Sequence, residues 1–212
     1  MSSTTLAQLH ALKETLNPWD LASFVNAAKK KKLNGVHCPF YRDWPLSDPS
    51  KFFTPELLHH WHKMFWDHDI KWCIHILSGA EIDFRFLILH LHTGLWQFHK
   101  GVSKLNQVTG REHCNIQHYI ILVIADAIPK DLLILICSLM DFQYLAQAPP
   151  ISGQTCMEIN LALKEFHNHK STIISPSARI GKHRKIINNW YISKLKLLQS
   201  VTLSIHESGA VI

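Results

Sequence analysis

The hydrophobic pattern opens with two short amphipathic segments. Leucines recur at three- and four-residue spacing through residues 3–16, which predicts a first helix. Pro18 then favours the start of a second helix, which ends near Gly35. We therefore expect residues 1–35 to form an N-terminal helical pair and residues 36–212 to form a single further helical region.

The stretch from residue 36 to residue 73 changes character halfway. Prolines interrupt its first half at positions 39, 45 and 49, which excludes regular structure there. Its second half predicts a helix, with Thr54 as the N-cap, Pro55 in the first position and Glu56 in the first turn. Large apolar side chains follow at helical spacing, so this helix has one buried side.

The later part of the chain is also mainly helical by its pattern. Thr109 and Glu112 have the spacing of a capping box, which predicts a helix to about residue 128, and Pro129 begins the next. Two more helices are expected over residues 155–173 and 190–204, separated by a basic loop at 175–185. Residues 77–109 are expected to be mostly loop, with a short strand where Ile82, Phe84 and Phe86 alternate with charged residues. The expected fold class is mainly α, an irregular helical array.

Composition and charge limit the functional classes. The chain has 212 residues, a formal net charge of +6 and a pI near 9.1, which permits contact with nucleic acid. Its five cysteines are scattered and include no Cys-x-x-Cys pair, which suits a reducing compartment. The most apolar stretch, residues 119–139, is interrupted at Pro129 and reads as two buried helices, so we expect no membrane partner.

Two groups of residues can carry binding chemistry. Histidines crowd around residues 59–62 beside Glu56, and imidazole and carboxylate suit zinc, although the spacing is not that of a zinc protease. Basic residues with tryptophans nearby are candidates for DNA contact. These DNA-binding candidates are Lys100, Lys104, Arg111, Lys182, Arg184 and Lys185. Ordinary surface charge and histidines that pack in the core are the alternatives to these two interpretations.

Several long motifs resemble one family. The segment RDWPLSDPSKFFTPELLHHWHKMFWDHD at residues 42–69 resembles the Plavaka transposases, enzymes of fungal DNA transposons related to the CACTA group. The resemblance continues in GAEIDFRF at 79–86 and in GVSKLNQVTGREH at 101–113. It recurs in LMDFQYLA at 139–146, EFHNHK at 165–170 and YISKL at 191–195. These motifs correspond to the later part of that transposase only.

The resemblance implies a catalytic chemistry for the complete enzyme. Such transposases have an RNase H-like core in which two aspartates and a glutamate hold two divalent metals, with Mg²⁺ implied. Glu112 is the candidate for the glutamate, and Glu81 and Asp83 are its rivals. The family motif of an acidic residue, two variable residues and a histidine corresponds to Glu56 and His59.

The same resemblance sets the functional expectation. The strands that carry the two aspartates are expected before residue 36, where the pattern predicts helices instead. We therefore expect a truncated transposase-like protein without autonomous DNA cleavage and without a cofactor of its own. It would bind DNA weakly, or pair with a full-length transposase or with itself, and be nuclear, otherwise cytoplasmic. The alternatives are a helical histidine-rich metal-binding protein and a non-catalytic protein-interaction module.

Overall fold

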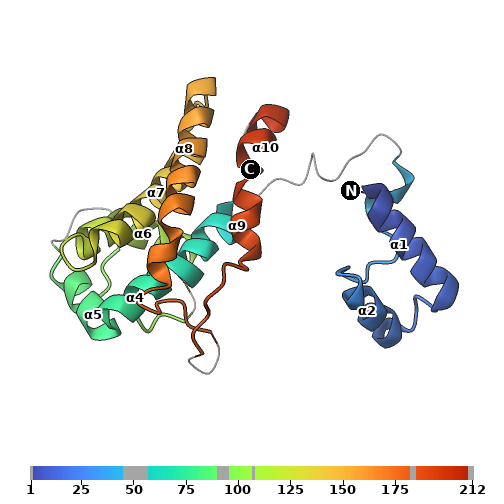
Figure 1. Ribbon diagram of the computed structural model, residues 1–212, viewed down its shortest axis with the longest axis horizontal. Helices are drawn as coiled ribbons and strands as arrows, with labels where there is room; N and C mark the ends of the chain where they lie inside the picture. Colours follow the sequence, from blue (N-terminus) through green and yellow to red (C-terminus); the bar gives the residue numbers. More distant parts are fainter. Residues whose placement is uncertain (1, 45–56, 90–95, 107, 182–184, 210–212) are drawn as a thin grey trace. The chain divides into compact units, whose positions relative to one another are not determined.

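The computed structural model describes residues 2–44, 57–89, 96–106, 108–181 and 185–209 (Figure 1). Backbone packing divides the chain into two compact units, Met1–Thr54 and Pro55–Ile212, which are described separately below. The boundary that the sequence predicts after residue 35 stays a prediction. Within the described residues, no helix is long and apolar enough to cross a bilayer.

Helices supply nearly all of the regular structure in the described residues. In chain order they are α1 (Ser2–Thr15), α2 (Leu21–Lys30), η1 (Phe40–Asp43), η2 (Leu57–His62), η3 (Phe65–Ile70), α4 (Lys71–Leu77), α5 (Gly79–Leu87), α6 (Gly110–Ile124), α7 (Lys130–Ala146), α8 (Gly153–His169), η4 (Lys170–Ile173), α9 (Ser193–Leu198) and α10 (Val201–Ser208). The described residues contain no strand, only an isolated bridge between Ile180 and Ile186. The mainly α prediction is confirmed, and the RNase H-like core stays a prediction.

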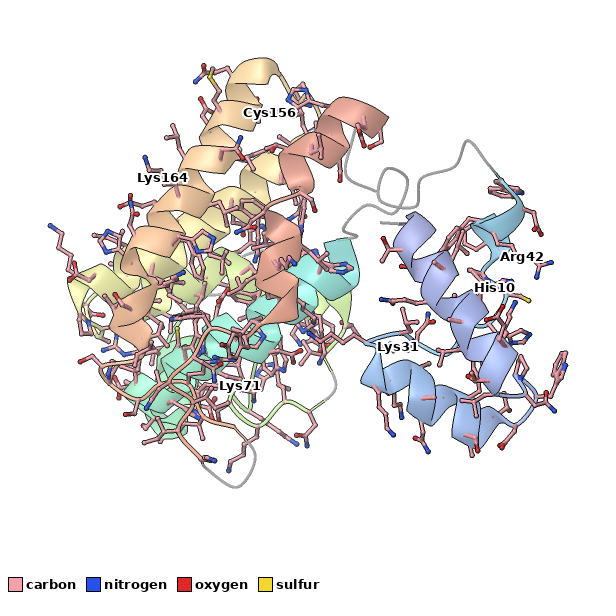
Figure 2. All side chains as sticks on the ribbon, turned by 45° about the vertical axis from the view of Figure 1, so that its right-hand side comes forward. His10, Lys31, Arg42, Lys71, Cys156 and Lys164 are labelled. Carbon is pink, nitrogen blue, oxygen red and sulfur yellow. The ribbon has the colours of Figure 1, made fainter. Side chains whose placement is uncertain are left out.

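The N-terminal unit packs α1 against α2 around a small core of Leu12, Phe24 and Ala28. The chain after α2 folds back onto α1, where the Sγ atom of Cys38 lies 3.5 Å from Lys13 Nζ. The same Sγ atom lies 2.7 Å from Arg42 Nη1. Figure 2 labels Arg42 and, at the end of α2, Lys31. The side chains of Lys13 and Arg42 therefore both contact the exposed thiol of Cys38.

The second helix begins later than its sequence pattern predicts. The Asn17 side chain accepts a hydrogen bond from the Trp19 amide at 3.0 Å, which keeps residues 17–19 in a turn. Asp20 is the actual N-cap, and its carboxylate accepts from the Ser23 amide at 3.3 Å. The predicted start at Pro18 is therefore wrong by three residues, because the asparagine competes with the helix for backbone donors.

The second unit is organised around a helix that runs from residue 57 to residue 77. Its first two segments, η2 and η3, are π-helical, with backbone hydrogen bonds that reach five residues back, and α4 continues them. The prediction of a helix here is confirmed, whereas its start at Thr54 lies outside the described residues. We call residues 57–77 the central helix.

Aromatic contacts join the central helix to its neighbours. The ring of Trp61 meets Phe142 of α7 edge-on at 6.1 Å, and Trp66 lies 5.8 Å from the His113 ring of α6. Trp72 meets Trp190, which precedes α9, at 5.7 Å. The predicted apolar side of this helix is therefore confirmed as the core of the unit for the residues whose side chains are described.

A helical hairpin of α7 and α8 forms one side of this unit (Figure 1). Helix α7 begins at Lys130 with Pro129 as its N-cap, one residue after the predicted start at Pro129. Helix α8 begins at Gly153, two residues before the predicted start, and Ser152 caps it in a reciprocal capping box with Thr155.

Residues 79–87 form helix α5, so the predicted strand at 82–86 is wrong. Ile82 and Phe86 are one helical turn apart and buried, whereas Phe84 is 57% exposed. The apparent alternation arose because an aromatic residue lies on the solvent side. The described residues between 88 and 109 have no regular structure, as predicted.

The C-terminal segment forms two short helices instead of one. Helix α9 ends at Leu198, α10 begins at Val201, and the Ser200 hydroxyl bonds the Leu197 carbonyl between them at 2.8 Å. The predicted helix over 190–204 therefore begins later and is interrupted. Tyr191, which falls within the predicted range, precedes α9 and is 90% exposed.

Candidate nucleic-acid interface

Asp83 of α5 holds a distant loop against the helix. Its Oδ1 atom accepts hydrogen bonds from the amides of Val102 and Ser103, both at 2.7 Å. Its Oδ2 atom accepts from the Ser103 hydroxyl at 2.6 Å. Bonds to an ionised carboxylate are shorter and stronger than neutral ones, so this single side chain fixes the turn around residues 101–103.

Apolar anchors fix the same loop from inside. Val102 is fully buried, and Phe98 is 7% exposed with its ring edge-on to Phe86 of α5 at 5.9 Å. The loop is thus held at two apolar points and by one carboxylate. We call residues 96–104 the basic loop.

Two lysines project from this loop. Lys100 and Lys104 flank the turn that Asp83 binds, and both side chains are exposed. Within the described part of the chain, neither forms an ion pair. Two ammonium groups are therefore presented to solvent on a fixed backbone, with their charge available to an anionic partner.

Asn115 connects the start of the basic loop to α6. Its side chain accepts from the Trp96 amide at 3.4 Å and donates to the Arg111 carbonyl at 2.8 Å. Arg111 is exposed, and the Trp96 side chain is 56% exposed. The structure therefore brings three of the predicted DNA-binding residues, Lys100, Lys104 and Arg111, to one region of the second unit.

Replacing Gly101 with alanine should destabilise the basic loop. Gly101 has φ +72°, and an added Cβ would clash with the side chain of Asp83. We expect the free energy of unfolding to fall by roughly 2–4 kcal/mol, measured by urea unfolding, because backbone strain and displacement of the clamp add. The matched control is Gly153→Ala, since Gly153 begins α8 and has open space around its α-carbon. An equal loss in both variants would contradict the clamp.

The second predicted basic group is only partly described. Lys182 and Arg184 lie outside the described residues, whereas Lys185 is exposed. Arg179, which precedes them, lies over the Trp190 ring at 6.0 Å and donates to Asn189 at 3.2 Å. Partial burial lowers the pKa of Arg179. This arginine is used in packing, so the group offers less free charge than the basic loop.

The carboxylate of Glu112 forms hydrogen bonds within the capping box at the start of α6. Its Oε2 atom accepts from the amide and the hydroxyl of Thr109, both at 2.8 Å, and the Thr109 hydroxyl accepts from the Glu112 amide at 3.3 Å. The predicted capping box is confirmed. The catalytic role of Glu112 stays a prediction, and the structure gives its carboxylate a structural task.

The rival carboxylates also have structural partners. Glu81 accepts from Arg85 Nε at 2.6 Å, and the same guanidinium donates to Asp126 at 2.5 Å and to the Val123 carbonyl at 3.0 Å. Arg85 lowers the pKa of Asp126 through these contacts. This arginine therefore ties α5 to the end of α6, while Asp83 binds the loop.

The described residues do not fit the two-metal site that the resemblance implies. Among them, no three His, Cys, Asp or Glu side chains gather closely enough to hold a metal ion. Glu56 and the side chain of His59 lie outside the described residues. His62 is buried, with Nδ1 3.0 Å from Gln117 Oε1, and Gln117 donates to Gln143 at 2.6 Å.

Sequence reasoning missed two residues that build the interface. Asp83 is predicted as a rival catalytic carboxylate, and its partners lie about twenty residues later, beyond any local signal. Asn115 is absent from the prediction, although its spacing of four residues from Arg111 places both on one helical face. The sequence shows a glycine at position 101, but it does not show that only glycine fits there.

Comparison with known proteins adds one finding. The family model described as Plavaka transposase matches residues 1–73, which include the N-terminal unit and most of the central helix. Neither the curated proteins nor the solved structures contain a match. The resemblance in the motifs after residue 73 stays a prediction. The match confirms the expected recognition: residues 1–73 of this chain are similar to Plavaka transposases, as a partial Plavaka-type transposase would be.

Proposed function

We propose that this transposase-derived chain binds duplex DNA through the basic loop and Arg111. The observation that carries the proposal is the Asp83 clamp, which fixes the loop while Lys100 and Lys104 remain exposed. A fixed backbone lowers the entropy lost when the lysines engage phosphates. The family match at residues 1–73 supports DNA as the partner, because a transposase acts on DNA ends.

The kind of charge on the basic loop favours contact with DNA phosphates over sequence-specific contact with bases. Lysine ammonium groups bind phosphates as point charges and carry no sequence information, whereas arginine can bind two acceptors at once. The proposal therefore predicts modest, strongly salt-dependent affinity with little sequence preference. The Trp96 indole is exposed, and the Trp96 amide bonds Asn115, which also binds the Arg111 carbonyl, so this ring can contact the same duplex.

We propose that this chain binds DNA but does not cleave it. Glu81, Asp83 and Glu112 each accept hydrogen bonds from protein donors, which supports a structural role for all three. Mg²⁺ chemistry is left to a complete transposase, with which this chain would share DNA. A nuclear location belongs to the same proposal.

The double variant Lys100→Gln/Lys104→Gln should weaken duplex binding roughly tenfold at low salt. Each lost phosphate contact also removes a released counterion, so the slope of log affinity against log salt should fall by about 1.8 in magnitude. Fluorescence anisotropy with a labelled duplex, from about 50 to about 200 mM salt, measures both quantities.

A second double variant controls for net charge. Lys130→Gln/Lys196→Gln removes the same charge from exposed positions of the same unit, outside the basic loop. We expect its salt slope to equal that of the wild type. Equal losses in the two variants would mean that net charge, and not the basic loop, drives binding, and absence of any duplex binding at low salt would remove the proposal.

A further inference from the structure

A groove runs between α7 and α8 on the outside of the helical hairpin. Its volume is about 790 Å³. The side chains that line it are Ser138, Asp141, Tyr144, Leu145, Ala148, Glu158, Leu161, Ala162, Lys164, Glu165 and Asn168. Figure 2 shows Lys164 on the outward side of α8. None of these residues belongs to the basic loop, so this is a second surface of the same unit.

The floor of the groove is apolar and open. Leu161 in the lining is 61% exposed, and Met157, one turn earlier on α8 and outside the lining, extends the apolar surface with 55% exposure. Tyr144 of α7 is 44% exposed on the facing helix, and the small side chains of Ala148 and Ala162 leave room between them. Large apolar side chains exposed along two neighbouring helices are typical of a surface that another helix covers.

The rim of the groove is acidic, although the chain is basic. Asp141, Glu158 and Glu165 line it against a single ammonium, that of Lys164. Glu158 accepts a neutral hydrogen bond from Gln154, and Glu165 lies 3.0 Å from His169. Asp141 has no ion pair within the described part of the chain. Negative potential here has the opposite sign to the net charge of +6.

We propose that this groove binds a basic amphipathic helix of a partner protein. The apolar stripe of the partner would cover Leu161, Met157 and Tyr144, and its lysines or arginines would pair with the three carboxylates on the rim. The lining of α8 runs from Glu158 to Asn168, which at 1.5 Å per residue accommodates about three turns of such a helix. Charge complementarity sets the orientation and excludes acidic helices and nucleic acid.

The probe is a fluorescein-labelled peptide of about 16 residues, with leucine along one helical face and lysine elsewhere. Its control peptide has glutamate in place of every lysine. Anisotropy with the full chain should show micromolar affinity for the lysine peptide and at least tenfold weaker binding of the glutamate peptide. Equal binding of the two peptides would overturn the proposal.

Variants assign the site. Leu161→Glu should weaken the lysine peptide about tenfold, because it places a buried carboxylate in the apolar contact. Lys164→Glu should tighten it about threefold by removing the one repulsive charge. The control Leu122→Glu changes a leucine of similar exposure (69%) on α6, outside the groove, and should leave peptide affinity unchanged. An unchanged Leu161→Glu would overturn the assignment.

The result is separable from the proposed DNA binding. Lys100→Gln/Lys104→Gln should leave peptide affinity unchanged, since neither lysine lines the groove. Duplex DNA should not displace the peptide. Displacement by duplex would show that the groove is part of the DNA surface and would overturn its assignment to a helix.

Discussion

Replacing Trp61 with alanine should lower the free energy of unfolding of the second unit by about 3–5 kcal/mol. The side chain has no exposed surface, and its ring meets Phe142 of α7 edge-on. Truncation removes the largest fully buried side chain of the central helix and leaves a cavity that the surrounding rings cannot fill. Chemical denaturation followed by circular dichroism measures the change.

An exposed aromatic residue of the same unit provides the comparison. Tyr191 is 90% exposed, so Tyr191→Ala should change the free energy of unfolding by less than about 0.5 kcal/mol. If Trp61→Ala and Tyr191→Ala were equally mild, the central helix would not be the core of the unit.

Asp69→Asn should stabilise the protein, increasingly so as the pH rises. Asp69 of the central helix is fully buried, and neither carboxylate oxygen has a hydrogen-bond partner among the described residues. Burial raises the pKa of Asp69 well above its ordinary value of 3.8. At a pH between the ordinary pKa and the raised one, Asp69 is deprotonated in the unfolded chain but still protonated in the folded chain. The wild type therefore loses stability as the pH rises towards and through the folded pKa of Asp69.

The measured quantity is the difference in unfolding free energy between variant and wild type. It should grow by about 1.4 kcal/mol per pH unit from just above pH 4 until the folded pKa is reached, and stay constant beyond it. The comparison uses this difference because His68 and His113 change the stability of both proteins in the opposite direction: they lower it as the pH falls, whereas Asp69 lowers it as the pH rises. Burial lowers the pKa of each to about 4, so acid from pH 6.5 downward destabilises both proteins alike. A difference that is independent of pH would contradict the burial of an uncharged Asp69.

Helix ends were the part of the fold that could best be predicted from the sequence. Thr109 with Glu112 and Pro129 act through the nearest backbone groups, so their effect is contained in a few residues. The errors arose where a side chain competed with that local signal. Asn17 delayed α2 by binding the Trp19 amide, and Phe84 made α5 look like a strand because it is an exposed aromatic residue.

The candidate interface was only half predictable. Lys100, Lys104 and Arg111 could be identified as basic residues near Trp96. Their common region depends on the contacts of Asp83 with residues 102–103 and of Asn115 with Trp96 and Arg111. No periodic pattern records contacts between segments far apart in the sequence. The π-helical hydrogen bonding of the central helix was also outside prediction, because apolar spacing does not distinguish it from an α-helix.

Amide hydrogen exchange with and without a synthetic duplex tests the central claim most directly, because it locates the contact on the chain. The account predicts that duplex slows exchange in residues 96–111, and that Lys100→Gln/Lys104→Gln abolishes this protection while the control variant Lys130→Gln/Lys196→Gln retains it. Protection confined to other segments, with residues 96–111 unchanged under conditions where the duplex binds, would contradict it.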